Sequence, residues 1–429
     1  MPSGLRCVRG NCNAGVLPHR PSMLDPAWRL CCITATNCMI ITSMYTMAPF
    51  MVLDFGATEN RQALGFWSGF IVAAFFLART VTSPSWGRLA DRIGRGRIVR
   101  VSLLLTGAST LCCGFATSLE TVAAARFVTG ACSAVHANCV ALGHQLSGAR
   151  GTAIVESGFS VGKLIGPGFV SWLLHAPLRA WTWDFPFLAP CGALALAQFL
   201  VVPLLPAETA SAVSPKNLLG GIDAAVADAD VAVQNRWRAR HAQVLSACFV
   251  VVTVAMEECF VLYGVGALGI SAPAVGTIYF GAGAVDLLLV NTVLLRLVKG
   301  ADAAKLARLR KLGLSLYALP LAGLPFIPAA TSDSATQVIL LGLFLGVRNS
   351  IAFVFFVSNM SLLNEASPGA AAAAQSLRMA IGSAMQVVGP PLGASAYAWS
   401  ATSGHPFPMD HHFTFLCAAA CSLCLASLA

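Results

Sequence analysis

The sequence predicts an all-α membrane protein with twelve transmembrane helices in two pseudo-symmetric six-helix bundles. Three observations predict this class. The 429-residue chain is 57% hydrophobic and only 10% charged, with a mean hydropathy of +0.73, whereas a soluble protein carries about 25% charged residues. Its apolar runs are long enough to cross a bilayer, which takes about 20 residues. The basic residues fall mostly in the short segments between these runs, where they set membrane orientation.

Twelve apolar runs correspond to the predicted transmembrane helices. Only helices or closed barrels can span lipid, and long runs that do not alternate with polar residues indicate helices. The runs lie near residues 31–53, 64–85, 98–117, 119–141, 152–175, 185–205, 244–264, 271–295, 311–329, 336–362, 372–398 and 411–429.

The order of these runs divides the chain into four parts. Residues 1–28 carry several arginines and prolines before any apolar core, so they are expected to form a disordered cytosolic tail and not a signal peptide. An N-terminal six-helix bundle is expected over 29–205 and a C-terminal six-helix bundle over 244–429. The central cytosolic loop over 206–243 is expected to contain an amphipathic helix from Ile222 to about Arg240.

The basic residues indicate which side of the membrane each loop faces. The odd-numbered loops hold only Arg61 and Arg179, so the positive-inside rule places both termini in the cytosol. The membrane is expected to be the plasma membrane or a vacuolar or other endomembrane. The net charge of +9 is spread over short loops, which argues against nucleic acid as a partner. The 15 cysteines are scattered and form no disulfide framework.

The segment from Gly87 to Arg97, interpreted as a short basic loop between the second and third spans, is the most distinctive motif. Its sequence is G-R-L-A-D-R-I-G-R-G-R. We expect neighbouring guanidinium groups, and any helix N-terminus that it meets, to stabilise the Asp91 carboxylate. The alternative is a solvated loop charge.

This motif resembles the signature loop between helices 2 and 3 of the major facilitator superfamily, which has the two-bundle fold described above. The resemblance implies a gate at the cytosolic side that links the two halves and holds the outward-facing state. The residues that match it are Gly87, Asp91, Arg92, Gly94, Arg95 and Arg97.

A glycine series lies in the fifth predicted span. Gly158, Gly162 and Gly166 share one helix face and let another helix approach closely, while Pro167 permits a bend. Together with Gly168, the series resembles the antiporter motif of helix 5 in the superfamily. It departs from that motif where two further glycines are common, and ordinary small-residue packing is the alternative.

Arg126 lies inside the fourth predicted span, where a charge costs at least about 2.5–3.5 kcal/mol and usually faces a cavity or a partner. With Gly130 it resembles the superfamily's R-x-x-x-G pattern, which implies a role in proton coupling; an arginine bonded to backbone carbonyls is the alternative. Arg348 is its rough counterpart in the tenth span, and Gly389-Pro390-Pro391-Leu392-Gly393 is the counterpart of the helix 5 series. Such paired features are typical of transporters built from internal repeats.

Other charges are also predicted to lie within the membrane. We expect one of the adjacent Glu257 and Glu258 to carry a proton or to contact substrate, since a desolvated carboxylate takes up protons readily. Lys163 and Arg348 fall near the middle of their spans, and Lys163 shares a helix face with Glu156, seven residues before it. For most of these charges a structural ion pair is the favoured alternative. The remaining members of the set are Arg79, Asp286 and Arg378.

The histidines of the chain are possible metal ligands, but their pattern predicts no metal site. His405, His411 and His412 cluster before the last span, and weak metal binding on the non-cytosolic side is the less favoured alternative. His136, together with Asn138 and Tyr263, is a further candidate to line a cavity. No cofactor is expected, and no arrangement of nucleophile and base indicates an enzyme.

The resemblance is closest to the zinc-induced facilitator-like group among the drug:proton antiporters. That group's Cys-Pro-x-Cys element is absent, and its loop histidine has only His241 as a counterpart. The resemblance implies a monomeric, proton-coupled antiporter that exports a small molecule or metal chelate. An uncoupled facilitator or importer of a nutrient such as a sugar, and a non-transporting receptor, are the alternatives. The supporting motifs are Gly65-Phe66-Trp67-Ser68-Gly69-Phe70, Ala78-Arg79-Thr80-Val81-Thr82-Ser83, Asp184-Phe185-Pro186-Phe187, Leu204-Leu205-Pro206-Ala207-Glu208-Thr209 and Leu363-Asn364-Glu365-Ala366-Ser367-Pro368.

Overall fold

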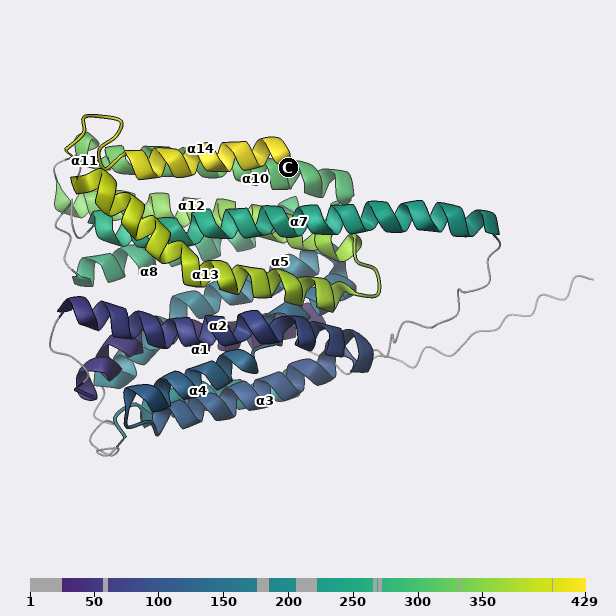
Figure 1. The fold of residues 1–429 in the computed structure, drawn as a ribbon, viewed down its shortest axis with the longest axis horizontal. Helices are drawn as coiled ribbons and strands as arrows, with labels where there is room; N and C mark the ends of the chain where they lie inside the picture. Colours follow the sequence, from purple (N-terminus) through teal and green to yellow (C-terminus); the bar gives the residue numbers. More distant parts are fainter. Residues whose placement is uncertain are drawn as a thin grey trace, which may run out of the picture.

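The computed structural model describes residues 25–56, 61–175, 185–205, 222–264, 268, 272–331, 333–402 and 404–429, and nearly all of them are helical (Figure 1). No strand occurs in this part of the chain. The first half contains α1 (Pro26–Asp54), α2 (Arg61–Ile93), α3 (Arg95–Gly114), α4 (Leu119–Ala131), α5 (Val135–His175) and α6 (Leu188–Leu200). The second half contains α7 (Ile222–Leu262), α8 (Ala272–Leu289), α9 (Leu295–Leu297), α10 (Ala303–Gly323), α11 (Ile327–Ala330), α12 (Ser334–Glu365), α13 (Ala371–Thr402) and α14 (Phe413–Leu428).

The twelve predicted spans correspond to these helices, with α5 shared between two of them. Ser147 and Gly148 have non-helical backbone angles inside α5. The fourth span is therefore α4 plus the first part of α5, and the fifth span is the remainder of α5. Within the described ranges, four stretches are long and apolar enough to cross a membrane by length and composition alone: Arg95–Gly114, Val233–Glu257, Thr277–Leu297 and Ser334–Glu365.

The two halves are built from the same helix pairs. In the first half α1 packs along α5, α2 along α4 and α3 along α6; in the second half α7 packs along α13, α8 along α12 and α10 along α14. When the first six spans are matched in order to the last six, these are the same three pairings. The predicted fold of two pseudo-symmetric bundles is therefore confirmed.

Glycines allow the closest of these pairs to form. A Cβ added at Gly158 or Gly162 would overlap a backbone carbonyl oxygen of α1, that of Cys31 or Ala35 respectively. In the second half, a Cβ at Gly393 of α13 would overlap the carbonyl oxygen of Ala255 on α7. The glycine series thus has the same packing role in both halves, between the first and fifth helices of each bundle.

The predicted loop between the second and third spans is wrong in its extent. α2 continues to Ile93 and α3 begins at Arg95, so only Gly94 lies between them. Its φ of +106° is a left-handed value that residues with a side chain rarely adopt. Arginine, leucine and alanine are strong helix formers, so the helix extends through the motif to this corner.

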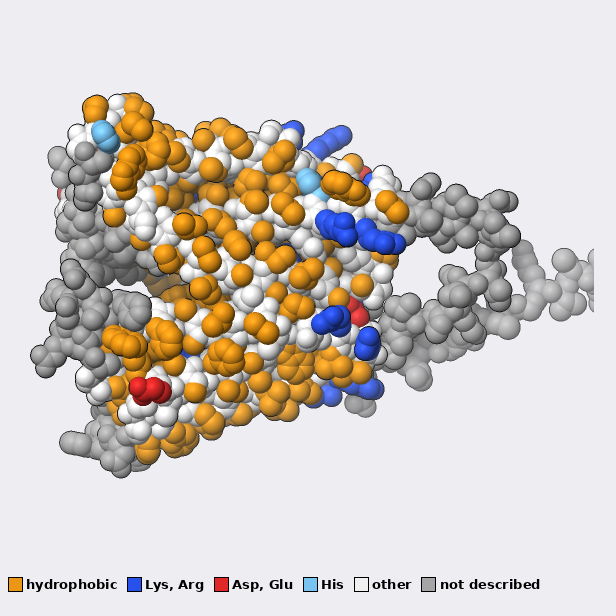
Figure 2. Space-filling view, viewed as in Figure 1, with side chains coloured by type: hydrophobic (Ala, Val, Ile, Leu, Met, Phe, Trp, Pro, Cys, Tyr) orange, Lys and Arg blue, Asp and Glu red, His pale blue; other side chains and the backbone are white. Residues whose placement is uncertain are grey.

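The two halves are joined at the end of the molecule that contains Gly94, which we call the gate end (right in Figure 1). One apolar cluster there joins Ala90 and Ile98 of the first half to Ala371 and Ala372 of the second. Another packs α5 against the π-helical turn Val290–Leu294 that follows α8, through Ala149, Ala153, Val290 and Leu294. Lys and Arg side chains gather at this end, and the surface is hollowed between the halves toward the opposite, far end (Figure 2).

The amphipathic helix predicted from Ile222 is continuous with the seventh span. Both belong to α7, which extends beyond the bundle at the gate end (Figure 1). Residues 1–24 and 206–221, which hold the predicted tail and the first part of the central loop, lie outside the described residues.

Candidate functional site

Asp91 connects the two halves at the gate end. Its Oδ1 accepts a hydrogen bond from the backbone N–H of Ala372 at 3.2 Å, and its Oδ2 accepts one from that of Ala373 at 2.8 Å. Both donors belong to the first turn of α13, where free N–H groups and the helix dipole favour a carboxylate. Asp91 of α2 therefore serves as an N-terminal cap for a helix of the other bundle.

Other residues of the motif support this contact. Arg95 Nη2 lies 3.2 Å from Asp91 Oδ1, and Arg95 Nη1 donates to Gln145 Oε1 at 3.1 Å. A Cβ added at Gly87 would lie 2.5 Å from the Cβ of Ser376, so only glycine lets α2 approach α13 this closely. Arg92 and Arg97 have exposed side chains at the same end.

A polar cluster connects the halves at the middle of the helices. Glu257 of α7 accepts a hydrogen bond from Arg348 Nη2 of α12 at 2.5 Å, and the same Oε1 lies 3.8 Å from Lys163 Nζ of α5. The Tyr279 hydroxyl donates to the other carboxylate oxygen at 3.3 Å. Arg348 is 2% exposed, but the side chains of Glu257 and Lys163 are 31% and 50% exposed. The ion pair between the halves is thus open to a molecule that enters between them.

Asp286 of α8 lies in the same region and is 5% exposed. Its two carboxylate oxygens accept hydrogen bonds from hydroxyls, Ser160 of α5 at 3.2 Å and Ser350 of α12 at 3.0 Å. Ser160 belongs to the first half and Ser350 to the second. The sequence could list Asp286 as a buried charge but could not reveal these serine partners.

The arginines of the first half differ in their partners. Arg79 of α2 donates to Ser383 Oγ at 2.6 Å and to Gln386 Oε1 at 2.9 Å, both on α13. Arg126 of α4 is 1% exposed, and its guanidinium lies 4.7 Å from the centre of the Phe75 ring. Its Nε and Nη2 have no hydrogen-bond partner among the described residues. Arg126 and Arg348 occupy corresponding helices of the two halves. They differ in their surroundings, because Arg348 has a carboxylate partner in Glu257, whereas Arg126 packs against the Phe75 ring.

The remaining candidates occupy separate positions. His136 Nε2 and Glu156 Oε1 lie 3.0 Å apart within the first half, without hydrogen-bond geometry. Asn138 donates to the carbonyl oxygen of Ala134 at 2.7 Å. Tyr263 lies near the far end and donates to the carbonyl oxygen of Pro325 at 3.1 Å. The side chain of Glu258 lies outside the described residues.

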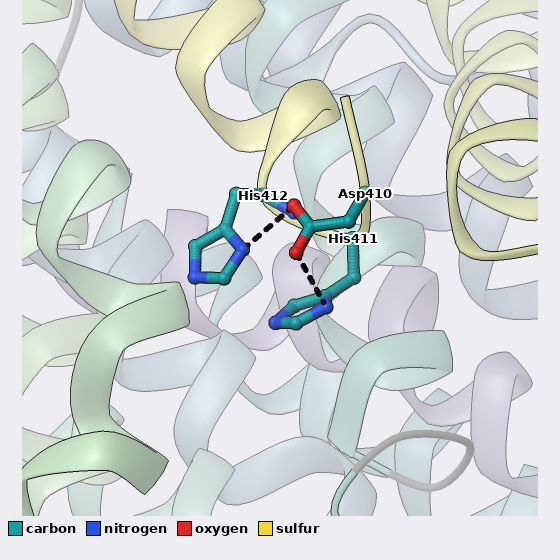
Figure 3. Close-up of side chains that lie close together, drawn as sticks. All are labelled: Asp410, His411 and His412. Carbon is teal, nitrogen blue, oxygen red and sulfur yellow. Dashed lines mark hydrogen bonds and ion pairs between the residues drawn. The ribbon is translucent and has the colours of Figure 1, made fainter. Parts of the chain in front are cut away.

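The histidines near the last span divide into two groups. His405 packs against Trp399, at 6.0 Å between ring centres. His411 and His412 instead lie beside Asp410 (Figure 3).

Comparison with known proteins is consistent with this architecture. The sequence model described as Major Facilitator Superfamily matches residues 30–399. The crystal structure of the human organic anion transporter MFSD10 (TETRAN) superposes on 94% of this chain and 100% of that chain, with a TM-score of 0.68 and 16% identity. This likeness concerns the fold alone.

Two curated relatives show the range of the similarity. Protein ZINC INDUCED FACILITATOR-LIKE 1 of Arabidopsis thaliana is 26% identical over 192 residues, which are 41% of this chain and 40% of that protein. The 4-hydroxybenzoate transporter PcaK of Acinetobacter baylyi is 28% identical over 169 residues, 38% of this chain and 35% of that protein. The chain thus spans about two fifths of the length of these relatives.

Two pseudo-symmetric helix bundles that meet at a polar cluster define a multi-pass membrane protein of the transporter type. The family match covers most of the chain, which therefore belongs to the major facilitator superfamily. The resemblance to zinc-induced facilitator-like proteins is confirmed by the relatives from Arabidopsis thaliana.

Proposed function

We propose that this chain is a proton-coupled antiporter that moves a small molecule or metal chelate out of the cytosol by alternating access. The observation that carries the proposal is the polar cluster shared by the two halves. The pair formed by Lys163 and Glu257 crosses between the halves at 3.8 Å and has exposed surface. Any ligand that binds either partner changes the balance between the conformations that make and break this pair.

Asp286 is the proposed proton-binding group. Glu257 has Arg348 at 2.5 Å and Lys163 at 3.8 Å, so its negative charge is compensated. Asp286 is buried, and within the part of the chain that the structure describes its carboxylate accepts hydrogen bonds from Ser160 and Ser350. A buried carboxylate without a direct cationic partner costs free energy that binding a proton removes. A proton on Asp286 would weaken its hydrogen bond with Ser160 in the other half, which joins protonation to the separation of the halves.

The proposed cargo is an organic anion or a chelated metal. The described interior holds six basic side chains and three acidic ones: Arg79, Arg126, Lys163, Arg310, Arg348 and Arg378 against Glu156, Glu257 and Asp286. Two guanidinium nitrogens of Arg126 have no hydrogen-bond partner in the described part of the chain, and an anionic ligand would satisfy them. The names of an organic anion transporter and a 4-hydroxybenzoate transporter among the similar proteins support this choice.

The orientation and membrane remain those proposed from the sequence. The gate end, where Lys and Arg gather, is taken to face the cytosol together with both termini (Figure 2). The protein would act as a monomer in the plasma membrane or in a vacuolar or other endomembrane. Its interior would then open away from the cytosol while Asp91 caps α13.

Transport by the reconstituted protein tests the proposal. Liposomes containing a pH-sensitive dye receive a proton gradient and then zinc, zinc with an organic chelator, potassium, lipophilic cations or organic anions. We expect an organic anion or chelate to trigger proton movement in the opposite direction. Substrate movement without proton movement would instead indicate a facilitator. Failure of every substrate, with folded protein, would contradict the proposed cargo class.

Three variants assign the roles within the cluster. Asp286→Asn should abolish substrate-triggered proton flux while exchange of labelled substrate persists, and Glu257→Gln should weaken substrate binding. Glu156→Gln is the matched control, because Glu156 is also buried but its nearby partner His136 belongs to the same half. Normal proton flux in Asp286→Asn would overturn the assignment of the proton site without contradicting antiport itself.

A further inference from the structure

Three successive residues bring their ligating atoms together at the far end of the second half. Asp410, His411 and His412 lie just before α14, and one ligand atom from each lies within 4.8 Å of the others (Figure 3). The Nδ1 atom of His412 is 2.8 Å from Asp410 Oδ1, and the Nδ1 atom of His411 is 3.6 Å from Asp410 Oδ2. Each carboxylate oxygen thus lies beside one imidazole, and the two rings lie 4.1 Å apart between their centres.

Neighbouring aromatic side chains pack against both imidazoles. His411 stacks on Tyr263, which directly follows α7, with 5.8 Å between ring centres and 18° between ring planes. His412 packs against Phe326 at 4.7 Å and against Phe407 at 5.4 Å. The His411 side chain is 36% exposed and that of His412 is 13% exposed. The cluster therefore has an aromatic wall and an open side, and its backbone turn is fixed by a hydrogen bond from the His412 N–H to Asp410 Oδ1 at 3.1 Å.

We propose that Asp410, His411 and His412 bind one divalent transition-metal ion, with Zn²⁺ as the best fit. Ligands at 2.0–2.1 Å in tetrahedral geometry lie about 3.3 Å from one another. The distances of 2.8 and 3.6 Å within the cluster bracket that value. Two imidazoles and one carboxylate suit Zn²⁺, whereas Ca²⁺ and Mg²⁺ require mainly oxygen ligands. The exposed side of His411 leaves the fourth position to water.

The site is separate from the polar cluster between the halves, and its occupancy would act on α7. Tyr263 comes six residues after Glu257 and directly follows the last residue of α7, Leu262. A bound ion would fix the segment between α13 and α14 against Tyr263 and so restrain the far end of α7. The metal proposed here is a resident ion of the second half, and it does not depend on what the protein transports.

Metal binding by the purified full-length protein tests the proposal. The protein carries a tag without histidine, is stripped with a chelator, and has its accessible thiols blocked, because Cys417 and Cys421 lie one turn apart on the exposed face of α14. Zn²⁺ is titrated against a chromophoric indicator, and Co²⁺ is titrated in parallel. We expect one Zn²⁺ per chain, and Co²⁺ absorption in the visible region without the near-ultraviolet band of a cobalt–thiolate bond.

Matched variants assign the ion to these residues. His411→Ala and His412→Ala should each weaken Zn²⁺ binding at least about tenfold. His405→Ala, in the same segment but outside the cluster, should leave it unchanged. Unchanged affinity in both ligand variants, or a thiolate band in the Co²⁺ spectrum of the blocked protein, would overturn the proposal. If a variant does not fold, the Co²⁺ spectrum of the wild-type protein decides, because it reports nitrogen and oxygen ligands without any substitution.

Discussion

Replacing Asp91 by asparagine should open the gate end. The carboxylate accepts two backbone N–H groups of α13, from Ala372 and Ala373, and pairs with Arg95 at 3.2 Å. Asparagine keeps one acceptor oxygen and loses the charge. A hydrogen bond to a charged group contributes about 1.5–3 kcal/mol, and a charge at a helix N-terminus adds about 0.3–1 kcal/mol. The closed gate should therefore lose about 2–4 kcal/mol, which shifts the ratio of closed to open protein by roughly 30- to 700-fold.

The distance between the halves at the gate end measures this shift directly. Spin labels attached through unnatural amino acids at Ile93 and Pro368, both exposed, leave the 15 native cysteines in place. We expect Asp91→Asn to add a population with a longer distance between the labels.

Asp302→Asn is the matched control. Asp302 caps α10, where its Oδ1 accepts the Lys305 N–H at 2.9 Å, but this contact lies within the second half. The control therefore removes a similar helix cap without touching the interface between the halves. If Asp91→Asn and Asp302→Asn both keep the wild-type distance distribution, then Asp91 does not hold the gate closed.

Three further predictions concern stability. Gly162→Ala places a Cβ against the backbone of α1 and should lower the stability of the folded protein by about 1–3 kcal/mol, which is visible as a lower apparent Tm. Gly168→Ala is the control, because a Cβ there enters open space and should leave the Tm unchanged. Equal Tm values for the two variants would contradict the packing argument. Arg348→Gln leaves Glu257 partly unpaired and should cost about 3–5 kcal/mol, and Glu257→Gln in the same chain should restore part of the Tm. Hydrogen bonds from the first turn of α12 lower the pKa of Asp333. The stabilisation of the folded protein by this carboxylate is therefore complete above the unfolded-state pKa of about 3.9 and is lost as pH falls through the lower folded-state pKa. Hydrogen-exchange protection of that turn should fall over the same pH range, and Asp333→Asn should remove this pH dependence.

The sequence predicts the fold well because one constraint dominates it. Backbone in lipid must satisfy its own hydrogen bonds, so long apolar runs have to be helices. The glycine series also predicts its own packing, since Gly158 and Gly162 leave room only for a neighbouring backbone. The corner at Gly94 is harder to predict, because the charged residues before it suggest a loop although they are good helix formers.

The partners within the site could not be predicted in the same way. Helical periodicity places Glu156 and Lys163 on one face of α5, but it does not select which residue of another helix each will meet. In the structure Glu156 lies beside His136, while Lys163 lies near Glu257 of the other half. Hydroxyls such as that of Ser160 give even less signal, because serine is common in membrane helices and only the fold brings it to a carboxylate.

The interface between the halves has opposite charge on its two sides at two depths. At mid-depth the first half provides the cation Lys163 and the second half provides Glu257. At the gate end the arrangement is reversed, since the first half provides Asp91 and the second half provides the positive N-terminus of α13. If a substrate or proton weakens the contact at mid-depth, the hydrogen bonds of Asp91 to α13 remain as a charged contact between the halves at the gate end. The free energy that Asp91→Asn removes from the closed gate, once measured, then gives how much free energy substrate binding must supply to open the gate end.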